Sequence, residues 1–150
     1  MPRKPSGSGR PSHPSQRARR RRVAGERLVR EARILACECD PAAERPVGDD
    51  VRQFGFEVVA HHNLADAVRE ATTSRFDVLV ASMPTLDPER LKLMQLLRRA
   101  IPSLPVVLVT SDGSIEMRTR CLALRPYYVA VRPLTSEELL TALKGALARG

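Results

Sequence analysis

Five short apolar runs, each followed by a more polar segment, constrain the fold of this 150-residue chain more than any other feature. The runs are apolar at consecutive positions and rich in β-branched residues, as expected of parallel strands that helices cover on both faces. Short connections between the repeats favour right-handed crossovers. We therefore predict an α/β domain with a doubly wound, five-stranded parallel sheet. The runs lie at residues 34–37, 58–60, 78–81, 106–109 and 127–131.

Helix-start signals separate these runs. Asn63 and Ser114 each precede an amphipathic stretch and can cap it, and Pro88 stands where a first helical turn tolerates proline. Thr135 and Glu138 have the spacing of a capping box at the start of a last helix. These signals predict four regular helices between and after the apolar runs.

The helix expected after the first run is weaker. Residues 41–53 contain Pro46 and Gly48, which cost about 3 and about 1 kcal/mol, respectively, inside a helix. We therefore expect a bent segment, or a turn followed by a helix from about Asp49.

The positive charge is concentrated at the N-terminal end of the chain. Residues 1–33 hold eleven of the 25 Lys and Arg residues and two acids, so this segment carries +9 and the remainder −1. Residues 1–32 are rich in Arg, Pro and Ser, which predicts a disordered tail before a domain at 33–150, with a short lead-in helix possible at 23–33. The tail is either a solvated extension or a polyanion-binding segment that uses Arg17, Arg19, Arg20, Arg21 and Arg22.

Several classes of protein are excluded on composition. No run of about 18 apolar residues exists, and no apolar stretch follows the basic N-terminus, so neither a membrane span nor a secretory signal is expected. The three cysteines include no C-x-x-C motif, which favours reduced thiols in a cytoplasmic protein. No phosphate-binding glycine loop occurs, and no G-x-S-x-G elbow surrounds Ser82, so we expect neither an enzyme nor a cofactor.

Five segments resemble, in order, the receiver domain of bacterial two-component response regulators. They are RILACECDPAA, GFEVV, FDVLVASMP, LPVVLVTSDG and YYVAVRPLTSEELLTAL, and the resemblance covers residues 33–149. It implies a flavodoxin-like fold with strand order 2-1-3-4-5. It also implies a site at the carboxyl ends of the strands, where an acidic pair and an Asp hold Mg²⁺, the Asp is phosphorylated, and a hydroxyl and a Lys contact the phosphoryl group.

This chain departs from the family at most of those positions. Glu38 and Cys39 stand at the acidic pair, so one carboxylate is replaced by a thiol. Ser82 stands at the phosphoacceptor position if Asp77 is matched to the acid that often begins this strand. Counting back from the Met-Pro that follows would place Val80 there instead, and neither register supplies an Asp.

The remaining family positions are matched in part. Thr110 matches the hydroxyl, Arg132 replaces the Lys before Pro, and Val129 replaces the switch aromatic, with Tyr128 beside it. A thiol and a hydroxyl are poor ligands for Mg²⁺, and a serine phosphate is a stable ester, unlike the acyl phosphate of Asp. The resemblance therefore implies a degenerate receiver that is not phosphorylated on Asp. Glu38 and Arg132 either form a salt bridge across the site or are solvated separately.

Two functions remain open at this stage. In the first, the domain is a signalling module that binds a protein partner, such as a histidine kinase or an output protein, through its last two helices and last strand. In the second, the arginine-rich tail binds nucleic acid and the domain contacts a partner.

The cysteines and histidines also allow two interpretations. Cys37 and Cys39 alternate, so in a strand both point to one face. Cys39, His61 and His62 meet in a metal site in one interpretation; in the other, the thiols pack as small apolar groups and the histidines lie in an exposed loop.

Overall fold

The computed structural model describes residues 32–149, which form five strands and five helices. Of the predicted tail at 1–32 and the lead-in helix at 23–33, residues 1–31 lie outside the described residues, and Arg33 belongs to the first strand and not to a helix. The strands are β1 (Arg33–Glu38), β2 (Glu57–His61), β3 (Val78–Ser82), β4 (Val106–Thr110) and β5 (Tyr128–Val131). The helices are α3 (Val47–Gln53), α4 (Leu64–Thr73), α5 (Pro88–Ala100), α6 (Ile115–Ala123) and α7 (Ser136–Arg149).

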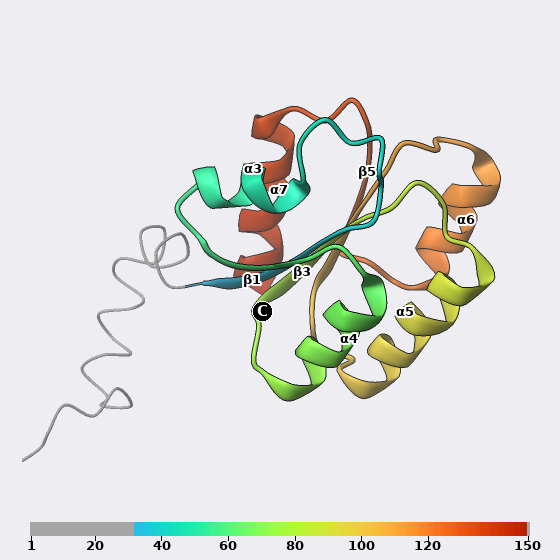
Figure 1. The fold of residues 1–150 in the computed structure, drawn as a ribbon, viewed down its shortest axis with the longest axis horizontal. Coiled ribbons are helices and arrows are strands. Elements are labelled where there is room, and N and C mark those ends of the chain that lie inside the picture. The colour runs from blue at the N-terminus through green and yellow to red at the C-terminus, as the bar shows by residue number, and fades with distance from the viewer. Residues whose placement is uncertain (1–31, 150) are drawn as a thin grey trace, which may run out of the picture.

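The strands form one sheet in the order β2-β1-β3-β4-β5, and every neighbouring pair is parallel. Helices α4, α5 and α6 cover one face, whereas α3 and α7 cover the other (Figure 1). This arrangement confirms the predicted doubly wound, flavodoxin-like fold with strand order 2-1-3-4-5.

Burial differs between the central and the edge strands. Every residue of β3 and β4 is buried, and so is all of β1 except Arg33. The edge strands β2 and β5 are largely half-exposed or exposed, because each has a neighbour on one side only. The prediction of strands covered on both faces therefore holds most fully for the centre of the sheet; at the edge, Val58 and Val59 of β2 are more exposed but still pack against the clusters on opposite faces.

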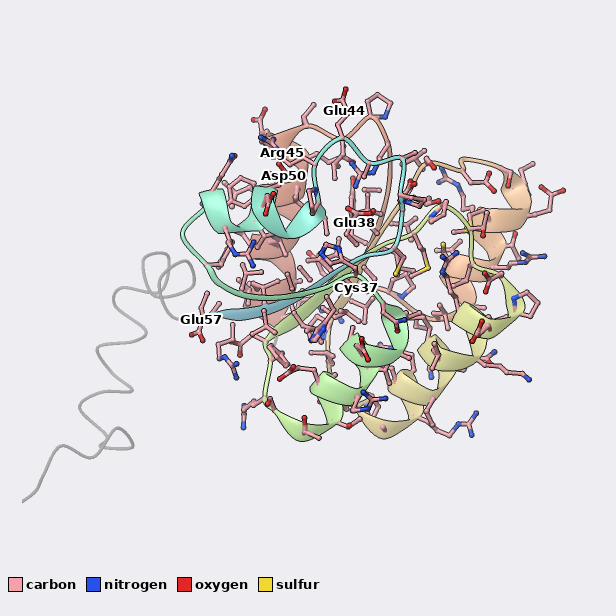
Figure 2. The ribbon with its side chains drawn as sticks, viewed as in Figure 1. Cys37, Glu38, Glu44, Arg45, Asp50 and Glu57 are labelled. Carbon is pink, nitrogen blue, oxygen red and sulfur yellow. The ribbon has the colours of Figure 1, made fainter. Side chains whose placement is uncertain are left out.

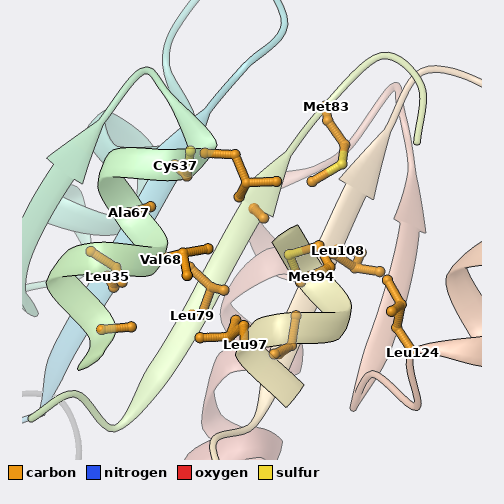
Figure 3. Packing of buried hydrophobic residues seen from close by; sticks show 14 of the residues in the cluster. Leu35, Cys37, Ala67, Val68, Leu79, Met83, Met94, Leu97, Leu108 and Leu124 are labelled. Carbon is orange, nitrogen blue, oxygen red and sulfur yellow. The ribbon is translucent and has the colours of Figure 1, made fainter. Parts of the chain in front are cut away.

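The larger buried cluster lies between the sheet and helices α4, α5 and α6. Leu35 and Leu79 from the strands meet Val68 of α4 and Leu97 of α5 there, with Met94 fully buried beside them (Figure 3). Burial of each such side chain contributes about 1.5–3 kcal/mol. This apolar layer fixes the strand ends on which the site described below is built.

The helix starts follow the sequence signals closely. The side chain of Asn63 accepts a hydrogen bond from the backbone of Asp66, and that of Ser114 accepts one from Met117, so both caps are confirmed. At α7, Thr135 Oγ1 accepts from the backbone N–H of Glu138 at 3.0 Å, which is one half of the predicted capping box. The carboxylate of Glu138 instead accepts from the hydroxyl of Tyr128 at 2.6 Å.

Helix α3 begins at Val47, two residues before the predicted start at Asp49. Pro46 precedes the helix instead of interrupting it, and the carboxylate of Glu38 accepts the otherwise unpaired backbone N–H of Val47 at 2.9 Å. Gly48 lies in the first turn, where a Cβ atom would be 3.4 Å from those of Ala36 and Ala60. These are ordinary van der Waals distances, so α3 packs against β1 and β2 at Gly48 without a clash that would exclude a Cβ atom.

Within residues 32–149, no helix combines the length and apolar character needed to cross a membrane.

Candidate functional site

The candidate site lies at the carboxyl ends of the central strands. Glu38 and Ser82 are the last residues of β1 and β3, and the register of the sheet places them opposite each other. Val80 pairs with Ala36, two positions earlier, and belongs to the core. Ser82 therefore lies at the strand end beside Glu38, whereas Val80 lies within the buried part of β3.

Glu38 is a buried carboxylate with three partners. Its Oε1 accepts hydrogen bonds from the backbone of Val47 at 2.9 Å and from Arg132 Nη2 at 3.2 Å. Its Oε2 accepts from the backbone of Asp40 at 3.1 Å. Figure 2 shows this residue beyond Cys37, at the end of β1. Because 7% of its side chain is exposed, these partners replace most of the solvation that a carboxylate needs.

Arg132 connects the fifth strand to the first and the third. Its Nη2 lies 3.2 Å from Glu38 Oε1 and 3.0 Å from Ser82 Oγ, and its backbone N–H donates to the carbonyl of Thr110 at 2.8 Å. Its Nε is buried without a hydrogen-bond partner among the described residues. Of the two arrangements expected for Glu38 and Arg132, the salt bridge is therefore the one present.

The hydroxyl of Thr110 is engaged with the neighbouring loops. Its Oγ1 donates to the carbonyl of Pro84 at 3.3 Å and accepts from the backbone N–H of Asp112 at 3.0 Å. Thr110 is 2% exposed at the end of β4, so the predicted hydroxyl stands at the expected strand end but is used to hold two loops together.

A second buried acid, Asp40, adjoins the site and was missed by the sequence reasoning, which counted Glu38 alone. Its Oδ1 accepts from the backbone of Ala42 at 2.9 Å, and its Oδ2 lies 3.4 Å from Ser111 Oγ. Only 7% of Asp40 is exposed. The available signal was its place two residues after Glu38, where the chain leaves the strand and turns back over the sheet.

The residues at these strand ends do not suit Mg²⁺. Mg²⁺ requires a near-octahedral set of oxygen ligands, usually from carboxylates, phosphate and water. Both oxygens of Glu38 are already used, and one of them contacts a guanidinium cation. The Ser82 hydroxyl contacts the same cation, and Cys39 offers sulfur in place of oxygen. A positive side chain therefore stands between the groups that would hold the ion.

Cys37 and Cys39 lie side by side on the face of the sheet that α4, α5 and α6 cover. Their Sγ atoms are 3.3 Å apart, Cys37 is fully buried and Cys39 is partly buried. This confirms the prediction that both thiols point to one face. Cys121 is buried in α6, away from this pair in the sequence.

His61 does not join Cys39 in a metal site. It is the last residue of β2, where the prediction had placed it in the following loop, and its Nε2 lies 3.1 Å from Glu70 Oε1. The strand is longer than predicted because His61 pairs with Cys37 of β1. Within residues 32–149, no three His, Cys, Asp or Glu side chains are grouped so as to hold a metal ion.

Tyr128 and Val129, predicted as the switch face, begin the edge strand β5. The Tyr128 hydroxyl donates to Glu138 at 2.6 Å, and this hydrogen bond raises the pKa of the phenol. Val129 is half-buried and packs on the cluster under α4, α5 and α6. The tyrosine is thus tied to α7 at the surface while the valine faces the core.

Comparison with curated proteins finds transcriptional regulators. The chain is 28% identical over 118 residues to the probable transcriptional regulatory protein SilR of Salmonella typhimurium and 29% identical over 118 residues to the transcriptional regulatory protein CusR of Escherichia coli. Each match covers 79% of this chain and 52% of the relative, so the chain spans about half the length of these relatives. No protein-family model matches the chain.

Solved structures with the same fold include a response regulator receiver domain protein from Methanospirillum hungatei, with a TM-score of 0.68 and 20% identity, covering 78% of this chain and 94% of that one. A putative pilus assembly-related protein from Burkholderia pseudomallei has a TM-score of 0.69 and 26% identity, and the match covers 79% of this chain and 90% of that one. Together with the strand order and the curated relatives, these likenesses show that the described domain has the receiver fold and is similar to the receiver domains of response regulators, which are signal-transduction modules.

Proposed function

We propose that this receiver domain is degenerate: it is not phosphorylated on Asp and acts as a protein-interaction module without enzymatic activity. The observation that carries the proposal is the Arg132 guanidinium, which contacts both Glu38 Oε1 and Ser82 Oγ. In this arrangement a fixed internal cation stands where a metal ion and a phosphoryl group would otherwise be bound. The site then has one stable state instead of two.

The chemistry of Ser82 supports the same conclusion. Its side chain is fully buried and accepts a hydrogen bond from Arg132, so it is neither exposed nor activated by a neighbouring base. Transfer of phosphate from an acyl or phosphoramidate donor to a serine hydroxyl needs such a base, because the hydroxyl is a weak nucleophile at neutral pH. We infer that Ser82 is a structural ligand of Arg132.

Incubation of the full chain with acetyl phosphate and Mg²⁺, followed by intact-mass spectrometry, tests the proposal. The expected result is that the mass of the unmodified chain does not change. A Cys39→Asp/Ser82→Asp double variant, treated in the same way for the same time, serves as the control. A phosphoryl adduct on the unmodified chain that hydroxylamine removes would identify an acyl phosphate and contradict the proposal.

The partner surface that we propose is formed by α6, β5 and α7. Ile115 and Leu122, seven residues apart on α6, are 80% and 59% exposed, and Tyr128 of β5 is 37% exposed. Large exposed apolar side chains at related helical positions favour contact with another protein. Leu122→Asp is expected to abolish binding of a candidate kinase or output protein, whereas Leu96→Asp on α5 serves as a control on a different helix.

The arginine-rich tail supports a second candidate function, in which the protein associates with nucleic acid. Five arginines in residues 17–22 would neutralise phosphates without reading sequence. Titration of DNA and RNA against the full chain and a chain that lacks residues 1–32 tests this role. Affinity that falls steeply with salt and disappears with the tail would support it, and equal binding by both chains would contradict it.

A further inference from the structure

Cys37 and Cys39 form a thiol pair that the receiver function does not use. One residue separates them at the end of β1, and their Sγ atoms are 3.3 Å apart. A disulfide has an S–S bond of about 2.05 Å and spans Cα atoms that are usually 4.4–6.8 Å apart. Alternate residues of a strand are separated by about 6.6 Å, so the pair lies at the upper end of the range that a disulfide bridges.

The two thiols have different surroundings. Cys37 is fully buried in the core cluster, where Leu35 and Leu79 also lie (Figure 3). Cys39 is partly exposed at the edge of the same cluster. An external reagent can therefore reach Cys39 first, with Cys37 directly behind it.

The groups around Cys39 favour its thiolate. The hydrogen bond from Cys37 lowers the pKa of the Cys39 thiol, and the positive charge of Arg90 and the backbone N–H of Leu64 act in the same direction. Partial burial and the charge of Glu38 act against this shift without reversing it. The same hydrogen bond, together with burial, raises the pKa of Cys37. A reactive outer thiol backed by a protonated inner one is the arrangement of attacking and resolving cysteines in thiol–disulfide exchange.

We propose that Cys37 and Cys39 form a reversible dithiol–disulfide site that is oxidised by low-molecular-weight disulfides. The Cys39 thiolate attacks one sulfur of the reagent RSSR, forms a mixed disulfide and releases one RS⁻. Cys37 then attacks the Cys39 sulfur and gives its proton to the departing sulfur, so that the second RS group leaves as the thiol RSH. The two protein thiols are oxidised by two electrons in total, and RSSR is reduced to two thiols.

This site adjoins the receiver pocket through the backbone. The N–H of Cys39 donates to the carbonyl of Ser82 at 2.7 Å, and Glu38 separates the two cysteines. Closing the disulfide must shorten the sulfur–sulfur distance by about 1.3 Å, from 3.3 Å to bond length. Oxidation is therefore expected to shift the strand end that carries Glu38.

The test equilibrates the full chain with mixtures of reduced and oxidised glutathione, blocks free thiols, and maps peptides after trypsin digestion without reduction. Cleavage after Arg33 and Arg52 places both cysteines in one peptide without Cys121, because trypsin does not cut the bond between Arg45 and Pro46. The expected product is that peptide with a mass lower by two hydrogens, and it should return to the original mass on reduction. If Cys37 and Cys39 are recovered in the blocked, unoxidised form at every glutathione ratio, or if either forms a disulfide to Cys121, the proposal is overturned.

Three variants separate the steps. Cys37→Ser should stop at the mixed disulfide, with glutathione attached to Cys39. Cys39→Ser should slow the reaction at least about tenfold, because the remaining thiol is buried and protonated. Cys121→Ser should leave the product unchanged and serves as the matched control. If Cys37→Ser accumulates no mixed disulfide, or if Cys39→Ser reacts as fast as the unmodified chain, the assigned order of attack is wrong.

Discussion

Replacement of Glu38 by Ala tests the arrangement at the strand ends through its cost in stability. The substitution removes the acceptor of two backbone N–H groups, those of Val47 and Asp40, and leaves Arg132 without its carboxylate. A buried donor left without a partner costs about 1–3 kcal/mol, and removal of one partner of a buried ion pair costs about 3–5 kcal/mol. These costs do not add, because the three partners share one carboxylate, 24% of the Arg132 side chain is exposed and water can replace part of the loss; we expect a total near the lower end for the ion pair, about 3 kcal/mol.

Urea denaturation and thermal melting of the full chain measure this cost. A loss near 3 kcal/mol corresponds to a fall in Tm on the order of 10 °C for a domain of this size. Glu57→Ala is the matched control, because Glu57 forms an exposed ion pair with Arg33 at 3.1 Å, whose loss costs at most about 1 kcal/mol. A loss for Glu38→Ala no larger than that for Glu57→Ala would refute the assignment of Glu38 as the residue that holds this site together.

Three further changes have defined outcomes. A change from glycine to alanine inside a helix is usually stabilising. Gly145→Ala should instead destabilise α7 by about 1–2 kcal/mol, because the new Cβ meets the ring and hydroxyl of Tyr127. A higher urea midpoint for this variant would contradict the observed packing. Ser114→Ala should cost about 1 kcal/mol through loss of the cap on α6, and an unchanged midpoint would show that water replaces the cap. The rate of alkylation by iodoacetamide should rise with pH at a lower midpoint for Cys39 than for Cys121, because the pKa of Cys39 is lowered whereas burial raises that of Cys121. Peptide mapping across pH 6–10 measures both midpoints, and the reverse order would contradict this difference.

The fold was predictable because its signals are local and repeated. Apolar runs, the caps Asn63 and Ser114, and the spacing of the elements all point to the same parallel sheet, and the structure confirms its strand order. The start of α3 was misplaced because it depends on a contact between distant residues, the carboxylate of Glu38 and the N–H of Val47. The residue types within 41–53 alone do not indicate that contact, because Glu38 lies outside this segment.

The site was predictable in part. The family resemblance identified Glu38, Ser82 and Arg132 as neighbours, and the salt bridge between the first and the last was one of two arrangements considered. The burial of Asp40 was not predicted, since it arises from the path of the loop after β1. The separation of His61 from Cys39 was one of the two interpretations left open, but the place of His61 at the end of β2, beside Glu70, was not predicted. Such details follow from register and loop path, which residue types alone do not fix.

The central claim, that the Arg132 side chain occupies a site unable to take Mg²⁺ and phosphate, is tested most directly by ¹H–¹⁵N NMR of the full chain. Spectra are recorded during titration with Mg²⁺ and then with acetyl phosphate, and the backbone amides of Cys39, Asp40, Met83 and Ser111 report on the strand ends. We predict that these resonances remain unchanged at millimolar Mg²⁺ and after the phosphoryl donor is added. Saturable shifts centred on these residues, accompanied by a phosphoryl adduct, would contradict the account.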